Sequence, residues 1–265
     1  MKLIVLFSVI ILSSASYGQW TEQSSIRTGS DCVWQVDLIG NVYLSQEGKI
    51  TKFDTSGVER YSQSIKSLGR IHQIETINTM KILVFSEEQQ TFSILDNTLS
   101  STNKTYDLSD LDFGYVPFVS ASSQPNKLWV YDQVNSKLVL LDYARSGQQQ
   151  EIGNMRGILG ASQLVFMKEQ NNQLYLMDED KKFYVFDLYG SLIQTVSLPE
   201  KYEFECLIKG EIYLSDSTGF YLFDRKTYKF VKVEIPKKEF DKVTWRHKIL
   251  FLEKEGILHR YYGKF

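Results

Sequence analysis

Short runs of apolar, aromatic and β-branched residues, separated by a few polar turn residues, repeat along the chain beyond residue 18. Such runs predict β-strands, and two runs joined by a short turn predict a hairpin. The chain shows six hairpins of this kind, whose first strands are 41–46, 81–86, 127–132, 173–178, 211–216 and 248–253. Five of the second strands end in an apolar residue followed by aspartate: Asp54, Asp96, Asp142, Asp187 and Asp224. This spacing indicates a repeat of about forty residues.

A further strand is predicted before and after each hairpin, which gives four strands per repeat. The preceding strands are 32–37, 71–77, 116–122, 161–167, 203–209 and 240–246. Five repeats are complete, the sixth lacks its last strand, and the extended segment 20–27 is free to supply it. Four-stranded units of about this length form propeller blades. We therefore predict an all-β, six-bladed β-propeller with four antiparallel strands per blade, closed by its N-terminal strand; a β-sandwich with similar hairpins is the alternative.

The recurring aspartates and aromatics have structural interpretations. An aspartate at the end of a strand caps the following turn by accepting backbone N–H groups. The first strand of each hairpin also carries one recurring large aromatic side chain, which we expect to pack between neighbouring blades. These aromatic residues are Tyr43, Phe85, Trp129, Tyr175, Tyr213 and Phe251.

Segment 40–57, GNVYLSQEGKITKFDTSG, resembles the blade signature of six-bladed NHL-like propellers, in which a Gly-Asn-aromatic strand precedes an Ile-x-x-Phe-Asp-x-x-Gly strand. Segments 173–190 and 211–224 are similar. The resemblance is to the NHL-like and TolB-like superfold, and it implies the fold alone. Enzymes and binding modules share this fold, so function has to be argued from a site.

The first eighteen residues predict a secretory signal peptide. A positive start at Lys2 precedes the apolar run 3–12, and small residues follow, which place cleavage after Gly18. The apolar run is shorter than the roughly 20 residues of a membrane-spanning helix. We thus expect residues 1–18 to be removed and residues 19–265 to form one exported domain, not membrane-spanning, in the periplasm, at the outer membrane or secreted from a bacterial cell; an uncleaved anchor is the alternative.

Charge and cysteine content narrow the class further. The formal net charge is only −2, which argues against nucleic-acid binding. Charge is nevertheless uneven, because residues 225–265 carry a net charge of +7 and residues 19–224 a net charge of −10. Two cysteines, Cys32 and Cys206, are too few for a disulfide scaffold. Export permits a disulfide between them, but the predicted blades separate them, and we expect two buried thiols.

The sequence offers no convergent catalytic set. It contains no Gly-x-Ser-x-Gly elbow, HExxH, P-loop or CxxC motif, and it implies no cofactor. The alternative to a non-catalytic protein is a lactonase-like, metal-dependent hydrolase that holds a divalent ion with Asp37, Glu75 and Glu203 on the first strands. The Glu-Asn-Asp set of gluconolactonase-like propellers is not matched, because none of the first strands carries an asparagine.

The prediction that follows is a scaffold or protein-binding module, an accessory subunit of a periplasmic or outer-membrane complex. The uneven charge indicates a docking face for an acidic partner, and solvated outer strands are the simpler interpretation. The residues predicted to bind the partner are Lys237, Lys238, Lys242, Arg246 and Lys248. The long connections 99–115 and 144–160 are further candidate contact surfaces. Carbohydrate binding through Tyr115 and Trp245 is a third possibility.

Overall fold

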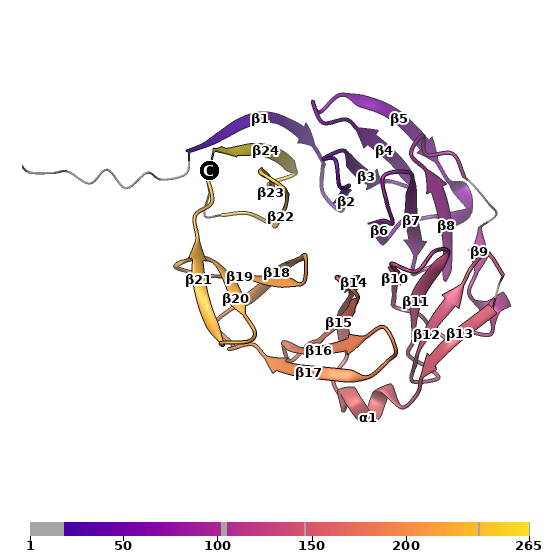
Figure 1. Ribbon diagram of the computed structural model, residues 1–265. Coiled ribbons are helices and arrows are strands. Elements are labelled where there is room, and N and C mark those ends of the chain that lie inside the picture. The colour runs from indigo at the N-terminus through magenta and orange to yellow at the C-terminus, as the bar shows by residue number, and fades with distance from the viewer. Residues whose placement is uncertain (1–18, 102–104, 146, 238, 265) are drawn as a thin grey trace, which may run out of the picture.

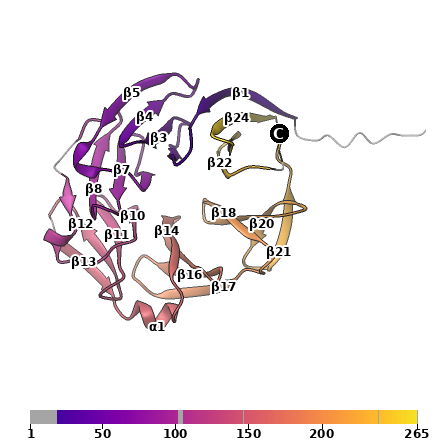
Figure 2. The ribbon, with the colours of Figure 1, turned by 180° about the vertical axis from the view of Figure 1, so that it is seen from behind.

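The computed structural model describes residues 19–101, 105–145, 147–237 and 239–264. Six four-stranded antiparallel sheets stand side by side around a central axis, each with its first strand innermost (Figure 1). The prediction of a six-bladed β-propeller is therefore confirmed. Viewed from behind, the ring has the same closed outline (Figure 2). The predicted signal peptide, residues 1–18, lies outside the described residues.

The first three blades follow one another along the chain. Blade 1 comprises β2 (Val33–Val36), β3 (Val42–Gln46), β4 (Lys49–Phe53) and β5 (Glu59–Ser64). Blade 2 comprises β6 (Gln73–Thr76), β7 (Lys81–Ser86), β8 (Thr91–Asp96) and β9 (Tyr106–Asp107). Blade 3 comprises β10 (Phe118–Ala121), β11 (Lys127–Asp132), β12 (Lys137–Asp142) and β13 (Gly147–Ile152). Short 3-10 turns, η1 (Lys66–Leu68) and η2 (Ser109–Leu111), lie in the connections before β6 and β10.

The last three blades complete the ring. Blade 4 comprises β14 (Leu164–Gln170), β15 (Gln173–Asp178), β16 (Lys182–Asp187) and β17 (Leu192–Ser197). Blade 5 comprises β18 (Glu203–Ile208), β19 (Glu211–Asp216), β20 (Gly219–Asp224) and β21 (Lys229–Val233). Blade 6 comprises β22 (Lys242–Arg246), β23 (Ile249–Lys254), β24 (Ile257–Lys264) and β1 (Gln19–Arg27). The one helix of the described residues, α1 (Met155–Leu159), lies at the outer edge of the ring.

The N-terminal strand closes the ring, as predicted. Strand β1 pairs antiparallel with β24 over its whole length, from Gln19 opposite Lys264 to Arg27 opposite Ile257. The two ends of the described chain therefore lie together in blade 6 (Figure 1). This pairing covers the backbone of β24, which would otherwise be an open edge.

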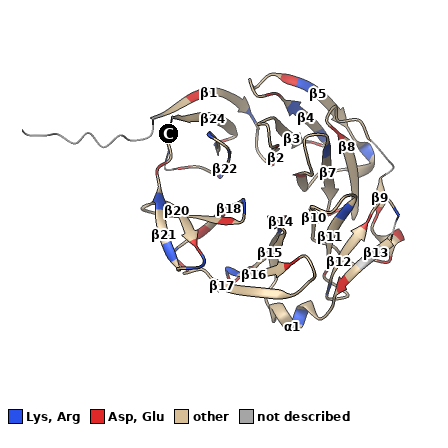
Figure 3. Cartoon of the chain, in the orientation of Figure 1, with Lys and Arg blue, Asp and Glu red and all other residues tan. Residues whose placement is uncertain are grey.

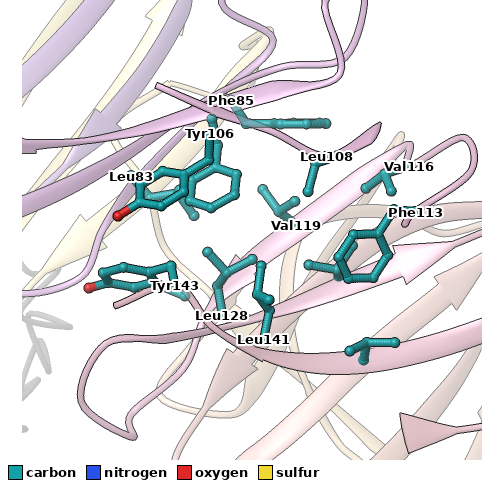
Figure 4. Close-up of a cluster of buried hydrophobic side chains, with 14 of the residues drawn as sticks. Leu83, Phe85, Tyr106, Leu108, Phe113, Val116, Val119, Leu128, Leu141 and Tyr143 are labelled. Carbon is teal, nitrogen blue, oxygen red and sulfur yellow. The ribbon is translucent and has the colours of Figure 1, made fainter. Parts of the chain in front are cut away.

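The hydrophobic core is divided into six clusters, one between each pair of neighbouring blades. In the cluster between blades 2 and 3, Phe92 stacks on Tyr106 with ring centroids 4.7 Å apart, and Tyr143 packs edge-on against both rings. Aliphatic side chains such as Leu83 and Leu128 lie around Tyr106 and Tyr143 (Figure 4). The six recurring aromatics are all buried, and each belongs to a different inter-blade cluster. The predicted role of these aromatics is confirmed: they hold each blade against the next.

The aspartates that end the third strands cap turns, as predicted. Asp187 accepts hydrogen bonds from the backbone N–H groups of Tyr189 and Ser191, both at 2.9 Å. Gly190 lies between them with a φ of 86°, a left-handed conformation that a side chain disfavours. The equivalent aspartate of blade 1, Asp54, accepts the same pair of bonds from Ser56 and Val58. The recurring aspartates therefore mark turns of the same geometry in these blades.

The two long connections are less open than the sequence suggested. Segment 99–115 contains β9 and buries Leu99, Leu108 and Phe113 in inter-blade clusters. Segment 144–160 contains β13 and α1, and the helix buries Met155 and Leu159 between blades 3 and 4. Both segments thus contribute largely to the outer strands and core, because each supplies the fourth strand of its blade.

Candidate functional site in the central channel

The six inner strands surround a channel that widens into a cavity on each side of the ring. We call face A the side on which the inner strands begin and face B the side on which they end. Cavity A is about 370 Å³ and is lined by the beginnings of all six inner strands. Cavity B is about 570 Å³ and is lined by their ends and by the turns that follow. Glu75, Lys168 and Arg246 line both cavities and so form the waist between them.

The waist contains one ion pair. Glu75 on β6 is 5% exposed, and its carboxylate accepts hydrogen bonds from the backbone N–H of Ala121 at 3.0 Å and from Ser120 Oγ at 3.4 Å. Lys168 Nζ on β14 lies 3.9 Å from Glu75 Oε1. Burial raises the pKa of Glu75 and lowers the pKa of Lys168, because each charged form loses its hydration. The carboxylate therefore serves mainly to join blade 2 to blade 3.

A second ammonium group stands in cavity A. Lys242, the first residue of β22, donates a hydrogen bond to the carbonyl oxygen of Trp34 at 2.9 Å, and its Nζ lies 4.4 Å from the centre of the Trp34 ring. Lys242 is exposed toward the channel, and the lining of cavity A surrounds it. This confinement lowers the pKa of Lys242 to about 8; attraction to Glu253 opposes the shift, and repulsion from Lys168 adds to it.

The third cation of the channel is Arg246, at the end of β22. Its Nη1 donates to the carbonyl oxygen of Trp245 at 3.0 Å, and its buried Nε has no hydrogen-bond partner among the described residues. No carboxylate of the described residues lies within ion-pair distance of Arg246 or of Lys242. Figure 3 marks the basic residues on β14 and β22, the inner strands of blades 4 and 6. Cys206 of β18 also lines cavity A, and burial raises the pKa of its thiol, which stays protonated.

Aromatic side chains complete cavity A. Phe118, Phe166 and Phe204, from the inner strands of blades 3, 4 and 5, line it. Phe166 and Phe204 meet edge to face with ring centroids 4.8 Å apart. These rings are only partly buried, because one side packs on the core and the other faces the cavity. Cavity A therefore combines an apolar wall of phenylalanine rings with two cations, Lys242 and Arg246, that no carboxylate of the described residues pairs with.

The mouth of the channel on face B has two unlike halves. The turns of blades 1 and 2 expose three apolar side chains: Leu38 (57%), Ile39 (59%) and Met80 (57%). The corresponding turns of blades 5 and 6 expose Lys209 and the pair His247–Lys248. Leu38, Lys209 and His247 all line cavity B. We call the first set the apolar arc and the second the basic arc.

The three acids of the predicted metal site lie apart. Asp37 is fully buried at the end of β2, where its carboxylate accepts from the backbone N–H groups of Ile39, Gly40 and Asn41. Glu203 lies at the start of β18 on face A and pairs with Lys181 at 2.7 Å. Glu75 lies at the waist, apart from the other two acids of the predicted set. Within the described ranges, no three His, Cys, Asp or Glu side chains gather closely enough to hold a metal ion.

The five predicted partner-binding residues are also dispersed. Lys242 and Arg246 point into the channel, and Lys248 lies in the basic arc on face B. Lys237 is 3.4 Å from His259 Nε2, which in turn contacts Glu22, so its surroundings are acidic as well as basic. Lys238 lies outside the described residues. The predicted residues that the structure describes are spread along β22 and its flanking turns, and β22 runs from face A to face B, so they do not form one surface.

The remaining candidates are placed as follows. Both cysteines are free and half-buried, so the expected thiols are present but not fully enclosed. The Tyr115 side chain is exposed and donates to Glu87. Trp245 packs edge to face on Tyr213, with centroids 4.2 Å apart. The two aromatics proposed for carbohydrate binding are therefore on different faces, Tyr115 on face A and Trp245 lining cavity B.

Sequence reasoning missed Lys168 and Lys209. The predicted inner strand of blade 4 ended at residue 167, whereas β14 runs from Leu164 to Gln170 and brings Lys168 into the channel. Alternation of Phe166, Lys168 and Gln170 was the available signal, since residues two apart share a face of a strand. Lys209 occupies a two-residue turn with a φ of 52°, and nothing in its sequence context distinguishes it from other turn lysines.

Comparisons with known proteins support the fold. A structure of catalytically inactive virginiamycin B lyase from Staphylococcus aureus with quinupristin is similar, with a TM-score of 0.60 at 12% identity over 88% of this chain and 81% of that one. The Neurospora crassa Pan2 WD40 domain has a TM-score of 0.60 at 9% identity over 92% and 95%. BBS1N, in complex with ARL6DN, has a TM-score of 0.54 at 10% identity over 84% and 74%.

At such low identities these likenesses show the propeller fold alone. No protein-family model matches the sequence, and neither does any curated protein. In the part of the chain that the structure describes, no helix has the length and apolar character needed to cross a membrane. The fold is thus a six-bladed propeller with structural neighbours that include a lyase, a WD40 domain and a propeller bound to another protein.

Proposed function

We propose that this chain is an exported, non-catalytic propeller that binds another protein at the mouth of the channel on face B. The observation that carries the proposal is the division of that mouth into an apolar arc and a basic arc. A partner segment with apolar side chains along one edge and acidic side chains along the other matches both arcs at once. The proposed activity is therefore protein recognition by a rigid ring.

The physical case rests on the combination of the two arcs. A single exposed leucine is common, but Leu38, Ile39 and Met80 lie together in turns of adjacent blades on face B. Leu38 lines cavity B, and the Met80 sulfur accepts one weak hydrogen bond, from Asn97 Nδ2 at 3.5 Å. Covering such side chains stabilises a complex by roughly 1.5–3 kcal/mol for each fully buried one. Lys209 and Lys248 add attraction for acidic groups, which favours fast and selective association.

Export places that partner in the cell envelope. The proposal that residues 1–18 are a cleaved signal peptide is supported by their positive start, apolar run and small residues before Gln19. A rigid module without catalytic machinery fits an accessory subunit of a periplasmic or outer-membrane complex. The BBS1N propeller in complex with ARL6DN is an example of this fold joined to a protein partner.

The test compares two variants of the tagged full chain, expressed in its native host. One variant disrupts both arcs at four positions and leaves Met80 and His247 in place (Leu38→Ser, Ile39→Ser, Lys209→Glu, Lys248→Glu). The control makes one change of each kind on face A, at the exposed Val134 (Val134→Ser) and Lys66 (Lys66→Glu). Envelope proteins are cross-linked, purified and compared by quantitative mass spectrometry.

We expect a specific partner that the arc variant loses and the control variant retains, and that salt of about 0.5 M weakens, because screening shortens the reach of the lysines. N-terminal sequencing of the purified chain is expected to begin at Gln19. A partner retained equally by the arc variant would refute the docking site. A chain recovered from the cytoplasm with residues 1–18 intact would refute export.

A further inference from the structure

We propose that cavity A is a binding site for a small organic acid, whose anionic group lies between Lys242, Lys168 and Arg246 and whose apolar body lies against the phenylalanine wall. This site lies on the opposite side of the waist from the protein-binding mouth on face B, although Lys168 and Arg246 line both cavities. Its contacts come from blades 3 to 6.

Lys168 pairs with Glu75, whereas the other two cations of cavity A, Lys242 and Arg246, have no carboxylate of the described residues within ion-pair distance; Glu253 and Asp37 act on them only from farther away. Lys242 and Arg246 direct their hydrogen bonds to main-chain carbonyl oxygens, those of Trp34 and Trp245, and not to carboxylates. The buried Nε of Arg246 is unsatisfied. A buried donor without a partner and two confined cations without anions are costly arrangements, and a bound anion would satisfy them together.

The acids that line the cavity are already engaged. Glu75 accepts hydrogen bonds from Ala121 and Ser120 and pairs with Lys168, and Glu87 accepts a hydrogen bond from Tyr115. Glu205 accepts a hydrogen bond from Ser215 Oγ at 2.5 Å, and burial raises its pKa as well. Cys206 is a neutral thiol among the three cations. The acids of the lining are thus engaged by other groups, whereas Lys242 and Arg246 are not paired with a carboxylate, and this arrangement favours an anion over a cation or a neutral ligand.

The apolar wall defines the rest of the ligand. Three phenylalanine rings line the cavity from the inner strands of blades 3, 4 and 5: Phe118, Phe166 and Phe204. Lys242 lines it from blade 6. A volume of about 370 Å³ falls in the range of small-molecule sites, which combine an apolar lining with a few convergent polar groups. Inorganic anions would leave these rings bare, so an acid with an aromatic or aliphatic body fits best.

A matched pair of fluorescent dyes tests this inference. The probe is 8-anilinonaphthalene-1-sulfonate, an apolar anion, and the control is N-phenyl-1-naphthylamine, which has the same rings without the acid. Both are titrated into the mature chain, and into the double variant Lys242→Gln/Arg246→Gln. Lys248→Gln on face B is the matched single-charge control, and circular dichroism verifies that each variant is folded.

We expect saturable one-site binding of the sulfonate, with the neutral dye bound about tenfold more weakly or worse, because charge-assisted contacts provide much of the affinity. The double variant is expected to lose about tenfold or more in affinity for the sulfonate, and Lys248→Gln to lose none. If the double variant fails to fold, Lys242→Gln alone is expected to lose about threefold, since its amine contacts only the Trp34 carbonyl and ring.

Three outcomes would overturn the site: no saturable binding of the sulfonate, equal affinity for the neutral dye, or undiminished affinity in the folded variants. The double variant leaves Leu38, Ile39, Lys209 and Lys248 unchanged, and the arc variant leaves Lys242 and Arg246 unchanged, so each site is tested by its own substitutions. Failure of the anion site is therefore distinguishable from failure of the proposed protein-binding function.

Discussion

Removing the carboxylate of Glu169 is expected to loosen the contact between blades 3 and 4. Glu169 on β14 is 7% exposed, and its two oxygens accept hydrogen bonds from the backbone N–H of Ser123 and from the indole Nε1 of Trp129, both at 2.7 Å. Trp129 is fully buried in the cluster between these blades. One side chain therefore satisfies the buried indole N–H of Trp129 and a partly buried backbone donor of the neighbouring blade.

The size of the effect follows from those two bonds. A hydrogen bond to a charged group contributes about 1.5–3 kcal/mol, and a buried donor that loses its acceptor adds its own desolvation penalty. Glu169→Ala is thus expected to lower the free energy of unfolding by about 3–5 kcal/mol. Glu169→Gln retains one acceptor oxygen and is expected to lose about 1–2 kcal/mol.

Urea unfolding, followed by circular dichroism and tryptophan fluorescence, measures these losses. The exposed Glu200 provides the control, and Glu200→Ala is expected to stay within about 0.5 kcal/mol of the parent. A double-mutant cycle with Trp129→Phe isolates the Glu169–Trp129 bond, and we expect a coupling energy of about 1.5–3 kcal/mol. A loss below about 1 kcal/mol for Glu169→Ala, or a coupling near zero, would refute the reasoning.

Three further predictions concern the core, the ring closure and the channel. Phe92→Ala is expected to lower the free energy of unfolding by about 3–5 kcal/mol and Phe92→Leu by clearly less, as measured by urea unfolding, because only alanine leaves a large void against Tyr106. A chain that begins at residue 28 lacks β1 and exposes the edge of β24. We expect this chain to self-associate in light scattering and to unfold at a lower temperature in thermal scans. A monomer with an unchanged unfolding temperature would contradict the closure. Confinement lowers the pKa of Lys242 to about 8 from 10.5, so between these values the unfolded chain binds more protons and stability rises with pH. Lys242→Met is expected to remove that rise, and an unchanged slope of unfolding free energy against pH would contradict it.

The fold was predictable because each blade repeats the same local rules. An aspartate that caps a turn, such as Asp54, and an aromatic side chain that faces the next blade, such as Tyr43, are set by contacts within one or two repeats. Their recurrence at nearly even spacing indicated the number of blades, and the unclaimed segment 20–27 indicated how the ring closes. These signals come from contacts within one or two repeats, so they can be recognised in the sequence alone.

The channel was less predictable, because all six repeats contribute to it and two of their inner strands are irregular. Strand β14 shifts register between Leu164 and Phe166, and β18 shifts between Phe204 and Cys206. A bulge changes which side chains face the axis, so simple alternation along the strand fails there. The basic run near the C-terminus was visible in the sequence, but whether Lys242 and Lys248 share a surface depends on where β22 begins and ends.

The division between core and channel determines which channel residues are free to change. Strand β22 places Val243 in the cluster between blades 5 and 6, whereas its neighbours Lys242 and Arg246 face the channel. The blades are held together by the inter-blade side of such strands, so variants at Lys242 and Arg246 are expected to keep the fold. Lys168 differs, because its removal would leave Glu75 buried without a counter-charge and force it to take up a proton. Variants at Lys242 and Arg246 therefore report on binding, whereas a variant at Lys168 reports on binding and folding together.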